Sequence, residues 1–587
     1  MFSHRCRLGI ARAIFSFYQV KDTIMNNLKK TSTETINFSS SVKTRPHRIP
    51  VSEHFQIHKE RPFLKHERAT TTMLVGGLSP THDFLFEGSM HSLGLKTKML
   101  PPTNLDAFHY GREYGNNGYC NPGYFTVGNL IRFLKDLHKS GVSKEEIIEH
   151  YVFFTIGCNA PCRFGMLETE YRMALKDSGF EGFRVIVFEN EGGLNQEVKG
   201  DGINVDPEFF LATINALNLA DVLNDWVYAT RPYEIEEGQT EAVLEKAKIL
   251  LYEKLKNKKR IELSQRADRV LGRLGLSDTV LFLRRFVEQI TSNYYTDALK
   301  EVRKIFETVK VDRFRPKTTV KITGEFWAIT TVGAGNFHMF EFLEREGADL
   351  LMEPVASLVQ FLFSKGKLRH KNRRKFLLRN EIKHWWNFGK WIKNVFSYYK
   401  KSLTLWCGNL LFRREYRRLL TALGAGHMLL DQTELQKIAQ PYYNINIEGG
   451  EGYMEIAKNI YYHDNDLAHM VLSLKPFGCM PSTQSDAVQA SVMERNKDMI
   501  FLPLETAGEG ETNAQSRVLM SLGDARIKSK TELREPRAAT SVSMEAMRTY
   551  VDNHPELKDP FYKVPHRKGV VSKAANFVYH VNELIES

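Results

Sequence analysis

Four cysteines in this sequence share one local setting, at the point where a strand or loop gives way to a helix. Cys120 stands in GYCNPGYFTVGNL, Cys158 and Cys162 stand in TIGCNAPCRFG, and Cys479 stands in LKPFGCMPSTQS. Proline close behind the thiol predicts the first turn of a helix in each segment. Four thiolates that face one cleft could hold an iron–sulfur cluster, whose usual protein ligands are cysteines.

The same setting favours ionised thiols. A helix N-terminus presents unpaired N–H groups and the positive end of the helix dipole, which stabilise a thiolate relative to a thiol. We therefore expect cluster or metal ligands at Cys120, Cys158, Cys162 and Cys479. Two nearby cations and two carboxylates at predicted strand ends could surround these ligands or act as acid–base groups, namely Arg163, Lys475, Glu325 and Glu505.

Two other interpretations of the cysteines remain open. A single cysteine is most often a small buried hydrophobic residue, and four cysteines also suit zinc. The C-x3-C spacing of Cys158 and Cys162, with distant partners, differs from the C-x2-C pairs of common zinc folds. Cys6 and Cys407 lack the loop-and-helix setting, and 6 cysteines in 587 residues are too few for a disulfide framework.

The elements that must position these residues follow an alternating pattern. Apolar runs typical of buried strands alternate with helical patterns from about residue 71, and the alternation resumes at about residue 318 after long amphipathic helices. This pattern predicts an α/β fold with two Rossmann-like parallel-sheet domains joined by a helical subdomain. Ligands gather at the carboxyl ends of the strands in such sheets.

We divide the chain into five parts on this basis. They are a disordered basic leader at 1–70, a first α/β domain at 71–235 with three of the cysteines, a helical subdomain at 236–316, a second α/β domain at 317–530 with Cys479 and an irregular basic insertion at 364–440, and a helical tail at 531–587.

Composition and charge narrow the function. With 42% hydrophobic and 26% charged residues the chain is predicted to be mainly globular. The net charge of +12 is local, because residues 1–70 hold 13 Lys/Arg against 5 Asp/Glu and residues 364–401 hold 13 against Glu381 alone. General nucleic-acid binding is therefore not favoured. The sequence has no apolar run of about 18 residues, so we expect no transmembrane segment and a cytoplasmic protein.

The basic segment at 364–401 also carries aromatic residues, including Trp385, Trp386, Trp391, Phe396 and Tyr399. This mixture could bind nucleic acid, an anionic membrane surface or an acidic redox partner. The other interpretation is a basic helical insertion that packs its aromatic side chains on the body of the protein.

Longer stretches around the cysteines resemble a known family. The stretches GREYGNNGYCNPGYFTVGNLIRFLK, CNAPCRFGMLETEYRMALKDSGFEGFRV, KITGEFWAITTVGAGN, SLKPFGCMPSTQSDAVQ and FLPLETAGEGETNAQSRV look like the 2-hydroxyacyl-CoA dehydratase and activase-related family of anaerobes, in the large branch without the ATPase domain. The resemblance covers roughly residues 73–345 and 448–525.

The resemblance implies an oxygen-sensitive iron–sulfur protein with a [4Fe–4S] cluster and a separate ATP-hydrolysing activase of the sugar kinase, Hsp70 and actin superfamily as its partner. The activase passes a low-potential electron to the cluster, and in the dehydratases of the family that electron lets an acyl-CoA substrate lose water. Four cysteines would saturate a [4Fe–4S] cluster, which suits electron relay better than substrate binding. A non-catalytic scaffold or nucleotide-binding regulator, with structural zinc, is the alternative from another functional class.

Overall fold

A computed structural model gives the structure of the chain and describes residues 61–157, 162–189, 193–194, 202–203, 207–258, 277–381 and 388–587. Cys6, Cys158, Trp385 and Trp386 lie outside the described residues. All described residues belong to one compact unit, Glu60–Ser587.

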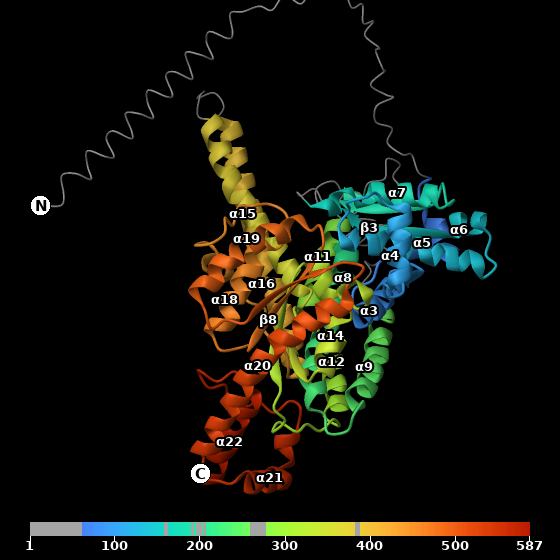
Figure 1. Ribbon diagram of the computed structural model, residues 1–587. Coiled ribbons are helices and arrows are strands. Elements are labelled where there is room, and N and C mark those ends of the chain that lie inside the picture. The colour runs from blue at the N-terminus through green and yellow to red at the C-terminus, as the bar shows by residue number, and fades with distance from the viewer. Residues whose placement is uncertain are drawn as a thin grey trace, which may run out of the picture. The chain divides into compact units, whose positions relative to one another are not determined.

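The fold is α/β, as the alternating pattern predicts, with two separate sheets flanked by helices (Figure 1). The first sheet has the strand order β2-β1-β3-β4-β5, and its first four strands are parallel while β5 runs antiparallel to β4. Its strands are β1 (Thr72–Val75), β2 (Thr97–Met99), β3 (Tyr151–Gly157), β4 (Arg184–Glu189) and β5 (Gly193–Leu194).

The second sheet has the order β7-β6-β8-β9 and is parallel throughout. Its strands are β6 (Thr318–Gly324), β7 (Ala348–Leu351), β8 (Met470–Pro476) and β9 (Phe501–Thr506). The four parallel strands of both sheets thus share one order, in which the second strand lies at the edge and the first lies beside the third. The order reverses between the first and third strands, where α/β sheets bind ligands.

Helices cover the faces of both sheets, since parallel strands are buried on both sides. Around the first sheet lie α3 (Pro80–Ser92), α4 (Leu105–Tyr114), α5 (Asn121–Lys139), α6 (Lys144–His150) and α7 (Leu167–Asp177), with the 3-10 turns η1 (Lys65–Ala69) and η2 (Arg163–Met166). Around the second lie α13 (Phe326–Thr330), α14 (Met339–Arg345), α17 (Gln432–Ala439), α18 (Gly452–Asp464), α19 (Met480–Arg495) and α20 (Glu511–Ala539), with η4 (Ala334–Asn336).

A helical layer shares one hydrophobic core with neighbouring helices, and it begins earlier in the chain than the predicted helical subdomain at 236–316. It consists of α8 (Pro207–Thr230), η3 (Arg231–Tyr233), α9 (Gln239–Lys256), α11 (Ser277–Thr291) and α12 (Tyr294–Phe306). Its centre is the stack of Trp226 on Phe306, both buried, with ring centroids 3.6 Å apart. The tail forms α21 (Met544–Asn553), η6 (Pro555–Lys558) and α22 (Lys573–Glu586), which bury Phe577 against Phe314. None of the described helices is long and apolar enough to cross a membrane.

Two segments differ from the expectation. Part of the predicted leader is packed, because Phe63 is 1% exposed and Glu67 pairs with the buried Arg184 at 3.0 Å. The basic insertion is regular where the structure describes it: α15 (Ala356–Glu381) and α16 (Phe388–Leu423) form a helical hairpin. Lysine and arginine favour helices, and the frequent charges hid the apolar periodicity of this segment.

Candidate functional site

The loops that carry the cysteines come together where the two sheets meet. The backbone N–H of Asn121, at the start of α5, donates to the carbonyl oxygen of Phe477 in the loop after β8, at 3.0 Å. Behind this contact the buried Phe125 of α5 packs on Trp327 of α13, with ring centroids 5.8 Å apart. Both side chains are apolar, and their helices flank different sheets. Their packing therefore holds the carboxyl-terminal edges of the two sheets together.

Gly478 lies where the Cys479 loop contacts the Cys120 loop. A Cβ atom at this glycine would lie 3.5 Å from the Cα of Cys120 and 2.8 Å from Nη1 of Arg163. The φ angle of Gly478 is +76°, a left-handed conformation that glycine adopts without strain. Only glycine lets the Cys479 loop approach the other two cysteine loops this closely.

Arg163 and Tyr119 tie the Cys162 loop to the Cys120 loop. Nη1 of Arg163 donates to the carbonyl oxygen of Gly118 at 2.6 Å, and the Tyr119 hydroxyl donates to the carbonyl oxygen of Arg163 at 2.5 Å. Cys162 directly precedes Arg163 and is therefore held beside the same loop. Sequence reasoning found Arg163 but missed Tyr119 and Gly478, although the left-handed turn is hinted at by PFGC.

Three of the four predicted ligand residues thus lie around one point, and the fourth, Cys158, lies outside the described residues. Cys120 is the N-cap of α5, Cys479 is the N-cap of α19, and Cys162 precedes η2. All three side chains are partly buried. In the described part of the chain no three His, Cys, Asp or Glu side chains form a group that could hold a metal ion.

The thiols are more strongly protonated than the helix-terminus argument predicts. Burial, with a smaller effect of the Glu325 carboxylate, raises the pKa of Cys120 to about 11 and that of Cys479 to about 12. Arg163 lowers the pKa of Cys120, and the Ser482 hydroxyl donates to Sγ of Cys479 at 3.1 Å, but neither contact reverses the shift. Both groups are therefore thiols at neutral pH in the metal-free protein, and a bound metal would displace their protons.

Glu325 lies at the reversal of strand order in the second sheet. It follows β6, its backbone N–H donates to the carbonyl oxygen of Leu474 on β8 at 2.9 Å, and its carboxylate accepts from the N–H of Ala328 at 3.0 Å. Burial raises the pKa of Glu325 itself. The carboxyl group of Glu451 is close enough to feel this charge: burial first, and Glu325 second, raise the pKa of Glu451 to about 8.

Behind this pair lies a buried network of charges around a cavity of about 10 Å³, enough for one water. Glu353 pairs with Lys321 at 2.9 Å and with Lys458 at 2.7 Å. Burial opposes ionisation of Glu353, but the two ammonium groups outweigh it and lower its pKa to about 2. Glu353 is thus a fixed carboxylate, whereas Glu451 is protonated for much of the neutral range.

The remaining two predicted residues occupy different places. Lys475 is 3% exposed, and its ammonium group pairs with Glu455 at 2.6 Å and also with Asp486. It contributes to the buried network of the second sheet. Glu505 is exposed on β9, where it stands opposite Lys475 in the strand register.

Large apolar side chains surround the cysteine loops at the surface. Phe477 is 57% exposed and Met166 is 59% exposed. Ile156 and Met480 are exposed as well. The thiols therefore lie below an apolar rim.

No family model, curated protein or solved structure matches this chain.

Proposed function

We propose that this protein carries an iron–sulfur cluster and works in low-potential electron transfer of the 2-hydroxyacyl-CoA dehydratase type. The convergence of Cys120, Cys162 and Cys479 around Gly478 is the observation that carries the proposal. These thiols come from both sheets and from three separate loops, and each stands at the start of a helix or helical turn. Buried structural cysteines have no reason to share such a place.

The donor set fits a cluster better than a single ion. The thiolates around a [4Fe–4S] cluster bind different iron atoms and so stand farther apart than the ligands of one zinc ion. Cys120, Cys162 and Cys479 come from three separate loops, which suits ligands of different iron atoms. Cys158, only four positions before Cys162, would complete the set.

The protein would supply charge balance and shielding to this site. A cluster, when bound, supplies reversible one-electron chemistry. Arg163 and the N-terminal N–H groups of α5 and α19 would offset the negative charge of the thiolates. Four cysteine ligands leave no iron free for a substrate, which favours electron relay over dehydration of an acyl-CoA.

The electron would come from a separate activase. The sequence has no P-loop and no phosphate motif typical of an activase, so we expect no ATP hydrolysis by the purified chain. The apolar rim formed by Phe477 and Met166 is a suitable place for such a partner to dock, because both side chains are exposed on the loops that carry Cys479 and Cys162.

Anaerobic iron and sulfide analysis tests the proposal. The wild-type protein should contain about four iron and four sulfide per chain and absorb at about 400 nm. Cys120→Ala, Cys162→Ala and Cys479→Ala should each lose most of the iron. Cys407→Ala is the matched control, because Cys407 is an equally half-buried free thiol on α16, and it should keep the full content.

Two results would contradict the proposal. One zinc ion per chain without sulfide would indicate a structural zinc site. A colourless, metal-free protein whose cysteine variants all behave like wild type would favour the scaffold or regulator interpretation.

A further inference from the structure

Helix α16 exposes a stripe of large apolar side chains. Five residues of α16 have large apolar side chains that are more than half exposed. They are Phe396 (69%), Tyr399 (57%), Leu403 (60%), Trp406 (54%) and Leu410 (51%). Their spacing of three and four places them on one face of the helix. With a rise of about 1.5 Å per residue the stripe is about 21 Å long. We call it the α16 stripe.

The α16 stripe is not the face that packs against α15. The imidazole of His370 on α15 stacks on Tyr398 with centroids 4.2 Å apart, and its Nε2 lies 2.9 Å from the Tyr398 carbonyl oxygen. Gly366 lets Leu405 approach, since a Cβ there would lie 3.5 Å from Cδ2 of Leu405. Tyr398 and Leu405 thus form the inner face of the hairpin. Tyr398 packs within the basic segment and not on the body, and Phe396 and Tyr399 are exposed.

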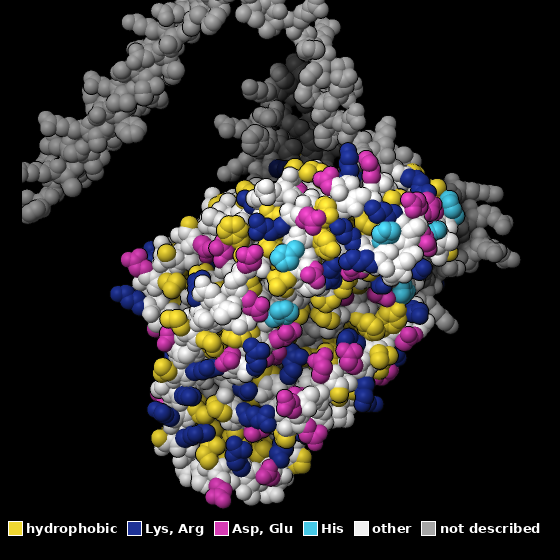
Figure 2. Space-filling view, turned by 45° about the vertical axis from the view of Figure 1, so that its right-hand side comes forward, with side chains coloured by type: hydrophobic (Ala, Val, Ile, Leu, Met, Phe, Trp, Pro, Cys, Tyr) yellow, Lys and Arg dark blue, Asp and Glu magenta, His cyan; other side chains and the backbone are white. Residues whose placement is uncertain are grey.

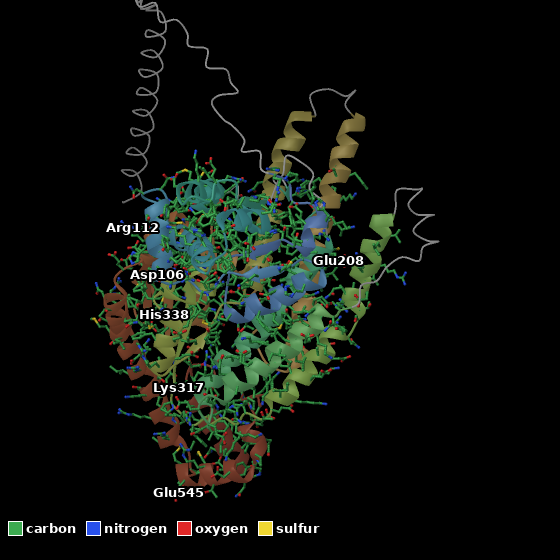
Figure 3. All side chains as sticks on the ribbon, turned by 90° about the vertical axis from the view of Figure 1, so that its right-hand side faces the viewer. Asp106, Arg112, Glu208, Lys317, His338 and Glu545 are labelled. Carbon is green, nitrogen blue, oxygen red and sulfur yellow. The ribbon has the colours of Figure 1, made fainter. Side chains whose placement is uncertain are left out.

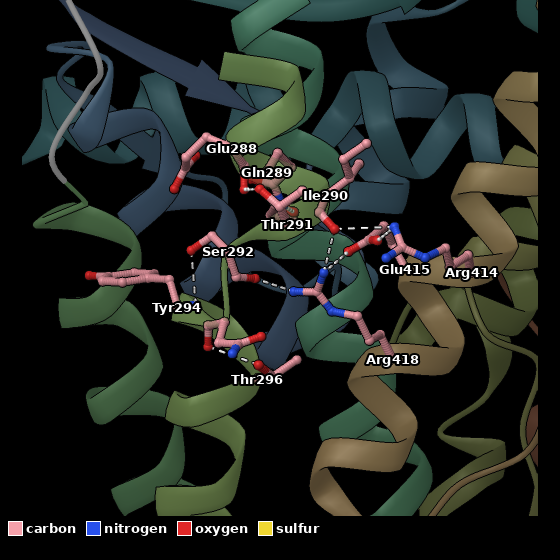
Figure 4. A network of polar contacts seen from close by, with 12 residues as sticks. Glu288, Gln289, Ile290, Thr291, Ser292, Tyr294, Thr296, Arg414, Glu415 and Arg418 are labelled. Atoms are coloured by element: carbon pink, nitrogen blue, oxygen red, sulfur yellow. Dashed lines mark hydrogen bonds and ion pairs between the residues drawn. The ribbon is translucent and has the colours of Figure 1, made fainter. Parts of the chain in front are cut away.

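The base of the hairpin is fixed to the body. Figure 4 shows Arg414 and Arg418 donating to the carbonyl oxygen of Ile290 at the end of α11, at 3.1 and 2.7 Å, and Arg418 also bonds the Ser292 carbonyl. On the other arm Lys365 donates to the carbonyl oxygens of Ile445 and Ile447. Beyond these anchors the two arms project from the body side by side (Figures 1 and 3). Farther along α15, Arg369 pairs with Glu448 at 2.8 Å and Asn372 donates to Asn446 at 2.8 Å. The stripe therefore lies on a hairpin that several contacts fix to the body.

The charge of the hairpin selects an anionic partner. Helices α15 and α16 together contain 16 Lys/Arg and only 2 Asp/Glu. One of the two acids, Glu415, is already paired with Arg414 and Arg418 at the base. A second copy of the hairpin would repel this one. The body is different: on the face in Figure 2 both signs of charge are interspersed.

The side chains of the stripe favour a lipid surface over a protein helix. Three of the five are aromatic, and Tyr399 and Trp406 combine an apolar ring with a polar group, which suits the boundary between headgroups and acyl chains. Leu, Ile and Val, not bulky aromatics, are the usual residues of a helical seam. We propose that the α15–α16 hairpin docks this protein on an anionic membrane, with the α16 stripe in the interface and basic residues such as Lys400 and Lys401 against the headgroups.

Vesicle co-sedimentation of the full-length protein tests this proposal. Vesicles of phosphatidylcholine with about 30 mol% phosphatidylserine should bind the protein, pure phosphatidylcholine should bind it weakly, and high salt should reduce binding. The triple variant Phe396→Ser, Leu403→Ser, Trp406→Ser should weaken binding at least about tenfold, because it removes three apolar side chains that the lipid would bury. Lys400→Glu with Lys401→Glu should weaken binding to the anionic vesicles only.

A matched control uses exposed apolar residues away from the hairpin. Ile249, Met520 and Ile527 are 57%, 76% and 66% exposed, on α9 and α20, and their replacement by Ser should leave vesicle binding unchanged. Thermal unfolding of both triple variants should match wild type, since all six side chains are exposed. No vesicle binding by the wild type, or unchanged binding by the stripe variant, would overturn the proposal. Stripe-dependent binding of single-stranded RNA or of an acidic peptide without vesicle binding would overturn it as well.

Discussion

The N–H of Asn121 donates to the carbonyl oxygen of Phe477 at 3.0 Å and so joins the helix that Cys120 caps to the loop that leads to Cys479. The bond connects residues on loops of different sheets. The cysteine site therefore exists only when both sheets are folded and in contact, and mutations that disturb this contact should disturb the site.

Gly478→Ala should destabilise the protein and reduce its iron content. The new Cβ would meet Arg163 Nη1 at 2.8 Å, and the left-handed φ angle adds strain, for a loss of about 2–3 kcal/mol in the free energy of unfolding. Gly510→Ala is the matched control: its φ is also left-handed at +98°, but a Cβ there meets nothing within 4 Å. It should lose about 1 kcal/mol and no iron. Urea unfolding and iron analysis measure both, and equal effects of the two variants would show that the contact with Arg163 is unimportant.

The metal-free thiols should resist alkylation at alkaline pH. Burial raises the pKa of Cys120 and Cys479 to about 11 and about 12, so their thiolate fraction, and with it the alkylation rate, should still rise about tenfold per unit between pH 8 and 10. In denaturant the alkylation rate should level off above about pH 8.5, which is the ordinary pKa of a cysteine thiol. Peptide mapping after iodoacetamide treatment gives the rate at each cysteine. A plateau below pH 9 in the folded protein would contradict the shift.

Glu325→Gln should speed this alkylation several-fold at pH 9. Removing the carboxylate charge lowers the pKa of both Cys120 and Cys479, because that charge opposes both thiolates. Glu505→Gln removes a carboxylate that is exposed on β9 and should change neither rate. Equal rates in Glu325→Gln and wild type would place Glu325 too far from the thiols to matter.

Glu353→Gln should destabilise the second sheet strongly. It leaves the buried ammonium groups of Lys321 and Lys458 without their shared carboxylate, a loss of about 3–5 kcal/mol at pH 7. The folded pKa of about 2 lies below the unfolded value, so this contribution is complete above about pH 5 and fades as the pH falls toward 2. Urea unfolding of wild type and variant should therefore differ most at neutral pH and converge in acid. The pair of Glu346 with Arg526, whose side chains are 31% and 35% exposed, provides the control, since Glu346→Gln should change stability by less than about 1 kcal/mol.

Most of the strands could be predicted from apolar runs because parallel strands are buried on both faces. The carboxyl-edge position of Cys120 and Cys479 followed from proline at the start of the next helix, and the structure has both as N-caps. The protonation of these thiols could not be predicted, because it results mainly from their burial between the loops and, to a smaller extent, from the charge of Glu325 in the second sheet. Lys475 shows the same limit: its ammonium group turns to Glu455, a partner that the sequence does not identify.

The common strand order of the two sheets has a consequence for how the chain could acquire new parts. In each sheet the connection from the second strand to the third crosses outside the sheet, from β2 to β3 and from β7 to β8. In the first sheet this crossover carries Cys120, and in the second it carries the α15–α16 hairpin. The same connection thus carries a predicted ligand loop in one half of the molecule and a projecting arm in the other. This connection therefore accepts long segments without a change in strand order.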